Sequence, residues 1–251
     1  MLGFGQTGLA KPLQNSLLKS TGMITNAHNK FDEVTKEPEP VTPGAIIDIE
    51  GTKYVVLEER ENNQALVMTT SSIGKRAFQS KYDFYGTKLR PDGQNANTYE
   101  ESEIDNYLEN EWYNGLSSTM KAAIQTTSIK QTSYGMNQSK QETGSNGQVY
   151  NTINRHVFLP SISEIGKVVD LKNPDKVKAF LKNSSIWTRD SHSNNDKKYG
   201  IDTGEFVYGL QGYTVGKLQA YGASNNEHIN PAFVIDLSKV DYKVAGHVDY
   251  K

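Results

Sequence analysis

The order of apolar and polar positions predicts strands at the start of the main body of this chain. Residues 46–49 and 53–59 are apolar runs joined by a Glu-Gly-Thr turn, a pattern typical of a β-hairpin. Residues 64–70 form another apolar run after a Glu-Asn-Asn turn. We therefore expect three consecutive antiparallel strands.

The pattern then changes to a helical period. Apolar residues recur at helical spacing from Ile104 to Trp112 on an acidic background. Gly115 is expected to end this helix, and Ser117 or Ser118 to cap a second short one.

Two further helices carry capping signals. Ser161-Ile162-Ser163-Glu164 has the spacing of a capping box, and Asn173-Pro174-Asp175 places a cap, a first-turn proline and an acidic residue in order. We expect a helix to begin at each of these sites.

The remaining segments favour strands. A polar insertion at 125–151 is interpreted as an exposed strand and loop, and later strands are expected at 156–160, around Trp187, and at 206–208, 218–221 and 233–237. Strands first, helices in the middle and strands last predict an α+β domain over residues 44–242, with both ends meeting in one sheet. Pro231 precedes the last strand, where its missing N–H does no harm.

Residues 1–43 differ from this body. They combine glycines, a short leucine-rich helical stretch and a charged Pro-rich linker at 35–44. A disordered tail and an anchoring arm that orders against a partner both fit this composition. The arm is preferred because it carries more apolar residues than a spacer needs: Leu9, Leu13, Leu17, Leu18, Met23 and Ile24. Residues 243–251 are interpreted as a C-terminal tail.

Composition narrows the classes of function. The 251 residues contain 27 Lys+Arg and 29 Asp+Glu, so nothing favours a nucleic-acid partner. There is no cysteine, which removes disulfides, thiol nucleophiles and thiolate metal sites. No secretory signal and no membrane span are seen in the sequence.

The order of motifs resembles a known family. Ile47–Leu57, Ser102–Tyr113, Val157–Glu164, Ile186–Arg189 and Asn230–Leu237 follow one another as in uncharacterised bacterial and phage domains with a C-type-lectin-like fold. These domains are distantly similar to the formylglycine-generating sulfatase-modifying proteins. The resemblance covers about residues 45–240 and implies a C-type-lectin-like domain with an extended N-terminal arm, without an established activity.

The activities of the better-known relatives are not expected in this chain. The sulfatase-modifying enzymes use active-site cysteines, which this chain lacks. The Glu-Pro-Asn, Gln-Pro-Asp and Trp-Asn-Asp triplets of calcium-dependent lectins are also missing, and the five histidines are scattered. We therefore predict no enzyme activity, no cofactor and no metal site.

Trp187 and Arg189 form the most distinctive pair of candidate functional residues in the sequence. Two residues apart on a strand, their side chains project to the same face. In one interpretation Trp187 is a core residue and Arg189 binds local carbonyls or a carboxylate. In the other the pair flanks a ligand pocket. The ligand-binding set predicted from this second interpretation is Trp187, Arg189, Tyr199, Tyr208, Tyr213 and Tyr221.

These observations predict a non-catalytic virion-type accessory protein of a phage or prophage. Residues 1–43 would dock onto other virion proteins within an oligomeric assembly. Loops at about 71–98, 130–150 and 190–228 would present Tyr, Asn and Gly to a host-surface glycan or protein. The alternative is an adhesion or glycan-binding domain at the bacterial cell surface.

Overall fold

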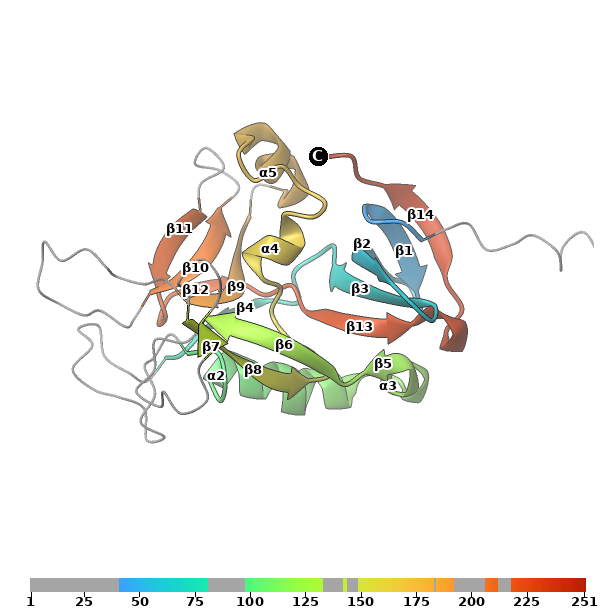
Figure 1. The fold of residues 1–251 in the computed structure, drawn as a ribbon, viewed down its shortest axis with the longest axis horizontal. Coiled ribbons are helices and arrows are strands. Elements are labelled where there is room, and N and C mark those ends of the chain that lie inside the picture. The colour runs from blue at the N-terminus through green and yellow to red at the C-terminus, as the bar shows by residue number, and fades with distance from the viewer. Residues whose placement is uncertain are drawn as a thin grey trace, which may run out of the picture. The chain divides into compact units, whose positions relative to one another are not determined.

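The computed structural model describes residues 41–80, 98–132, 142–143, 149–182, 184–191, 206–211 and 218–251 (Figure 1). All of them belong to one compact unit, Val41–Lys251. This unit is a mixed α+β domain of mostly antiparallel sheets with a few short helices. The predicted α+β class is confirmed.

The central element is a six-stranded sheet built from both ends of the domain. Its order is β14-β1-β2-β3-β13-β5, and every neighbouring pair is antiparallel. The strands are β1 (Ala45–Ile49), β2 (Thr52–Arg60), β3 (Gln64–Thr69), β5 (Ile124–Gln125), β13 (Ala232–Asp236) and β14 (Lys243–His247). The expected meeting of the first and last strands in one sheet is confirmed.

The turns of this sheet follow from local sequence. Glu50 and Gly51 adopt positive φ values of 51° and 80°, and the Asp48 carboxylate accepts a hydrogen bond from the Gly51 amide at 2.9 Å. Asn62 and Asn63 both have φ 59° in the next turn, a region that asparagine tolerates. The three predicted strands therefore form, and each pairs antiparallel with the next.

Two smaller sheets complete the β structure. One has the order β11-β10-β9-β12-β4, and the other has the order β6-β8-β7 (Figure 1). Their strands are β4 (Lys75–Ala77), β6 (Thr127–Thr132), β7 (Glu142–Thr143), β8 (Val149–Arg155), β9 (Ser185–Ser191), β10 (Phe206–Gln211), β11 (Leu218–Gly222) and β12 (Asn226–His228).

The helices are short and begin where the sequence places caps. Ser102 opens α2 (Glu103–Asn106), which continues into the π-helix η1 (Tyr107–Trp112) and the 3-10 turn η2 (Tyr113–Gly115). Ser117 caps α3 (Ser118–Ala123) by accepting a hydrogen bond from the Met120 amide. The structure adds the π-helical turn, which apolar spacing alone does not distinguish from an α-helix.

The two capping predictions after residue 160 are confirmed. Ser161 and Glu164 form a complete capping box at the start of α4 (Ile162–Ile165). Asn173 accepts hydrogen bonds from two amides at the start of α5 (Pro174–Phe180), with the proline in the first turn. A last 3-10 turn, η4 (Leu237–Lys239), follows β13.

The core lies where these layers meet and is rich in aromatic residues. Phe233 of β13 contacts Tyr54 edge-on at 5.3 Å and Trp112 at 6.2 Å between ring centroids. The largest fully buried aromatic side chains are Trp187, Tyr99, Phe78, Phe158 and Phe233. Burial of this kind stabilises each side chain by about 1.5–3 kcal/mol.

Two expectations are corrected. Residues 156–160 do not form a strand, since the amides of His156 and Val157 bond to the Glu109 carboxylate and only Phe158 forms a bridge, to Ala232. Residues 243–251 include β14, the edge strand, rather than only a tail. All five residues of β14 are exposed, so its side chains give no alternating signal, and main-chain pairing to β1 holds it in place.

A glycine at the start of the sheet tests how β14 is held. Gly44 has φ 94°, and a Cβ there would lie 2.6 Å from the Val248 carbonyl oxygen. We predict that Gly44→Ala lowers the free energy of unfolding by more than the ~1 kcal/mol typical of alanine at positive φ. The variant should also increase hydrogen–deuterium exchange of the β14 amides.

Gly51→Ala is the matched control. Gly51 also has positive φ, but a Cβ there would meet no atom of the described part of the chain within 4 Å. This variant should lose stability without faster exchange in β14. Equal β14 exchange in the two variants would contradict the account.

Candidate functional site

Trp187 lies in the core of the domain. It is completely buried on β9, its indole Nε1 donates to the Arg76 carbonyl at 2.9 Å, and its ring contacts Phe78 edge-on at 5.8 Å. Phe78 in turn packs against Tyr99. These contacts agree with the interpretation in which Trp187 is a core residue.

Arg189 is also buried, with 4% of its surface exposed. Its guanidinium forms a bidentate pair with Glu164, at 2.7 and 2.6 Å from the two carboxylate oxygens. It also donates to the carbonyls of Leu159 and Lys130, each at 2.8 Å. One side chain therefore joins β9, the start of α4, the segment before it and β6.

The surroundings of Arg189 shift the pKa values of two neighbouring carboxyl groups. Burial alone would raise the pKa of Glu164, but Arg189 and hydrogen bonds from Ser161 lower it on balance. Burial raises the pKa of Asp190, opposed by Arg189 and by the Ile162 amide, which donates to Asp190 at 2.7 Å. Glu164 therefore serves both as the capping-box residue of α4 and as the counter-ion of Arg189.

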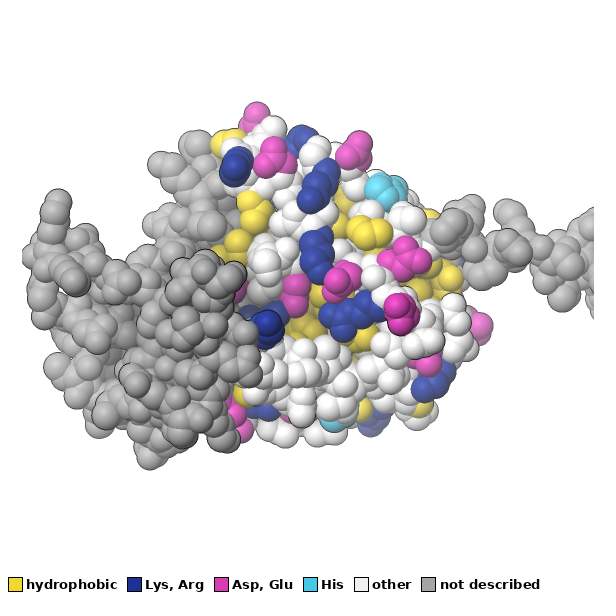
Figure 2. All heavy atoms as spheres, viewed as in Figure 1, with side chains coloured by type: hydrophobic (Ala, Val, Ile, Leu, Met, Phe, Trp, Pro, Cys, Tyr) yellow, Lys and Arg dark blue, Asp and Glu magenta, His cyan; other side chains and the backbone are white. Residues whose placement is uncertain are grey.

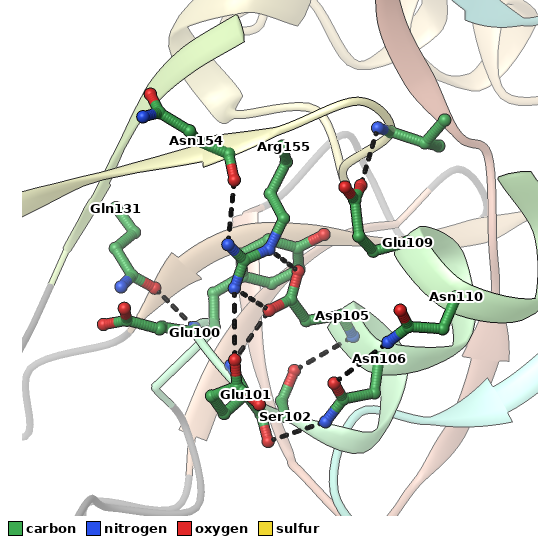
Figure 3. A network of polar contacts seen from close by, with 12 residues as sticks. Glu100, Glu101, Ser102, Asp105, Asn106, Glu109, Asn110, Gln131, Asn154 and Arg155 are labelled. Atoms are coloured by element: carbon green, nitrogen blue, oxygen red, sulfur yellow. Dashed lines mark hydrogen bonds and ion pairs between the residues drawn. The ribbon is translucent and has the colours of Figure 1, made fainter. Parts of the chain in front are cut away.

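A second buried ion pair links α2 to β8. Asp105 is 1% exposed and accepts two hydrogen bonds from Arg155, at 2.9 and 2.7 Å (Figure 3). Burial raises the pKa of Asp105 although Arg155 opposes this, and Asp105 in turn raises the pKa of Arg155 against the effect of burial. The Glu101 amide and the Ser102 cap complete the surroundings of Asp105.

The same network extends to the third sheet. Gln131 of β6 accepts a hydrogen bond from the Glu100 amide at 2.7 Å (Figure 3). Asn151 of β8 donates to the Glu100 carboxylate at 3.1 Å. Gln131 and Asn151 are direct partners in the β6–β8 register. The turn before α2 is therefore fixed to β6 and β8.

A hydroxyl, an imidazole and a carboxylate lie in a row beside this network. Thr126 Oγ1 is 3.0 Å from His156 Nε2, and His156 Nδ1 is 2.7 Å from Glu109 Oε1. Tyr113 stacks on the imidazole at 4.5 Å. A hydroxyl, an imidazole and a carboxylate also follow one another in this order where a nucleophile is activated in some hydrolases.

The other carboxylate oxygen of Glu109 has a structural role. Glu109 Oε2 accepts hydrogen bonds from the amides of His156 and Val157, at 2.9 and 3.2 Å. It thereby holds the chain as it leaves β8. The sequence alone identifies neither this cluster nor the Asp105–Arg155 pair, because the partners are about fifty residues apart and follow no motif.

Of the four tyrosines in the predicted site, two lie on described strands. Tyr208 and Tyr221 belong to β10 and β11, paired with Ala220 and Val207 respectively. Tyr199 and Tyr213 lie outside the described residues, as do the six apolar residues of the predicted arm, Leu9, Leu13, Leu17, Leu18, Met23 and Ile24. The ligand-binding role of the set stays a prediction.

A pocket of about 400 Å³ opens elsewhere, between the six-stranded sheet and α5. Ile46, Val55 and Met68 line it from the sheet, and Phe180 and Tyr250 from the other side. In the space-filling view, apolar side chains reach the surface between α5 and β1, among basic and acidic ones (Figure 2). The sequence gives no sign of this pocket, because its walls come from segments far apart in the chain.

Two absences hold for the residues that the structure describes. In that part of the chain no three His, Asp or Glu side chains gather as a metal site would need. Likewise, none of the helices seen there is long and apolar enough to cross a bilayer.

Comparison with known proteins identifies a family model. The model, described as a domain of unknown function (DUF6273), matches residues 62–237. This span runs from β3 to β13 and includes both buried ion pairs. No curated protein and no solved structure matches the chain.

The Arg189–Glu164 pair yields a stability prediction. Glu164→Gln leaves a buried guanidinium without its counter-ion, so we expect a loss of about 3–5 kcal/mol in the free energy of unfolding. Arg189→Met combined with Glu164→Met removes both charges but leaves the Leu159 and Lys130 carbonyls without their donor, so it should recover only part of this loss. Lys167→Met, which breaks the half-exposed pair with Glu58, should cost less than about 1 kcal/mol. Urea denaturation measures all three.

The same pair makes the free energy of unfolding depend on pH. Since the pKa of Glu164 is lower in the folded state, its contribution is complete above the unfolded-state pKa and is lost as pH falls through the folded one. The advantage of the wild type over Glu164→Gln should therefore shrink below about pH 4.5. An advantage that stays constant into acid would contradict the assignment.

Proposed function

This chain belongs to the DUF6273 family, and we propose that it is a non-catalytic binding module, a virion-type accessory protein of a phage or prophage. One observation supports the proposal that the module is not a catalyst. The buried charged groups of the described domain are engaged with main-chain atoms and with one another, as Arg189 is with Glu164 and two carbonyls. Charges used in this way fix segments to each other and leave recognition to the loops.

We further propose that the α+β domain has a C-type-lectin-like fold. The support is the resemblance of the ordered motifs, together with a sheet in which β1 pairs with β14 and β3 with β13. When the first and last strands of a domain pair in one sheet, long loops between them can be tolerated without disrupting that sheet. The ligand-binding role of the four tyrosines belongs to this proposal, whereas the buried Trp187 and Arg189 have the core role described above.

Residues 1–43 act in this proposal as the anchor. Their apolar residues would order against other virion proteins, and the domain would be displayed in an oligomeric assembly, free to contact a host-surface glycan or protein. The localisation is then the virion. The alternative is an adhesion or glycan-binding domain on the bacterial cell surface, which uses the same module with a different attachment.

Particle association separates these two proposals. After prophage induction in the cells that encode it, the full chain should sediment with phage particles in a density gradient. A chain reduced to the compact unit Val41–Lys251 should remain soluble, because it lacks the anchor. Sedimentation with cell envelopes in the absence of particles would favour the adhesion alternative, and a full chain found only as soluble monomer would overturn both.

The Thr126–His156–Glu109 row tests the non-catalytic claim. If its role is structural, the wild type and Thr126→Val should hydrolyse p-nitrophenyl acetate at the same rate, equal to that of a denatured sample. Thr126→Val keeps the shape of the side chain and removes only the hydroxyl next to His156. A faster wild type, by about tenfold or more, would instead make the row a nucleophilic site.

A further inference from the structure

The pocket beside α5 has an apolar floor formed by one row of the sheet. Ile46 pairs with Val55, and Val55 pairs with Met68, so the three side chains lie on one face of three neighbouring strands. Val55 and Met68 are almost completely buried. Phe180 and Tyr250 contact each other edge-on at 6.2 Å and form an aromatic wall. The body of a ligand held here would be apolar.

The charged residues that line this pocket have one sign. Lys53 and Lys182 line the pocket, and no Asp or Glu is among its lining residues. Neither ammonium group forms an ion pair in the part of the chain that the structure describes. Two exposed cations beside an apolar cavity, without a carboxylate to balance them, favour a ligand with a negative charge.

Lys182 is also held in an unusual backbone conformation. It follows α5 with φ 50°, a left-handed position that favours glycine or asparagine. A lysine side chain at the rim is therefore kept at some conformational cost.

The floor contains an incompletely bonded polar group as well. Asn230 is 6% exposed and donates its Nδ2 to the Thr69 carbonyl at 2.9 Å, while its Oδ1 has no hydrogen-bond partner among the described residues. Buried acceptors without a partner are rare in folded proteins and often mark a site completed by water or a ligand. This acceptor lies at the same pocket as the two lysines, where water beside a ligand can donate to it but an anionic group cannot.

We propose that this pocket binds a small amphipathic anion: an apolar chain or ring of about eight carbons that carries one carboxylate, sulfate or phosphate group. The volume of about 400 Å³ lies within the range of small-molecule pockets. The apolar body would cover Ile46, Val55 and Met68, and the anionic group would lie between the rim lysines. The proposal is independent of whether the chain is a virion component.

The experiment compares octanoate with octanamide, which has the same chain and no charge. Calorimetry should give at least about tenfold tighter binding for octanoate, with affinity that falls as salt is raised. Octyl sulfate and octyl phosphate extend the test to the other anionic groups. In methyl NMR spectra, octanoate should shift the Met68 signal and leave that of Met120, a core residue outside the pocket, unchanged.

Variants decide whether the pocket is responsible. Lys182→Gly removes one cation and suits the left-handed backbone, so it should weaken octanoate binding about tenfold without loss of thermal stability. Ala179→Trp, at an exposed lining position, should fill the pocket and abolish binding. The controls are Lys75→Gly and Lys178→Trp, both exposed and outside the pocket. Equal binding of octanoate and octanamide, or binding unchanged in both pocket variants, would overturn the proposal.

Discussion

The buried guanidinium of Arg189 is the interaction on which the rest of this domain depends. It reaches Glu164, the Leu159 carbonyl and the Lys130 carbonyl from β9, and so binds four separate segments at one point. A buried charge is costly unless its hydrogen bonds are complete, and this one is nearly complete. Val157, Phe158, Leu159 and Ile165 of this region are completely buried, so packing holds it in the core. The Arg189 contacts add the polar connections that fix α4 and the segment before it to β9 and β6.

The same principle recurs around the domain. Arg155 joins β8 to α2 through Asp105, and Glu109 holds the two amides that follow β8. Apolar burial supplies most of the folding free energy, whereas these directional contacts specify how irregular segments connect to the sheets. A domain with short helices and three separate sheets needs such connections, because helix and sheet ladders alone leave its junctions undetermined.

Much of this fold could be predicted from the sequence, and the reasons are local. The first hairpin, the capping box at Ser161 and the proline-started α5 each depend on residues within a few positions of one another. The edge strand β14 could not be predicted because its side chains are all exposed, and residues 156–160 were wrongly predicted as a strand because a distant Glu109 takes their amides. The core environment of Trp187 was one of two interpretations, while the ion-pair partners and the pocket depend on tertiary contacts that no spacing reveals.

The central claim is that the Arg189 contacts make β6, the 157–165 segment and β9 one cooperative unit. Native-state hydrogen exchange tests it most directly, since the Leu159 amide donates to the Tyr99 hydroxyl, and the Arg189 amide to the Pro160 carbonyl. The account predicts that the amides of Leu159, Ile165 and Arg189 exchange only through an opening as costly as global unfolding. Exchange of Leu159 and Ile165 through a cheap local opening, with Arg189 still protected, would contradict it.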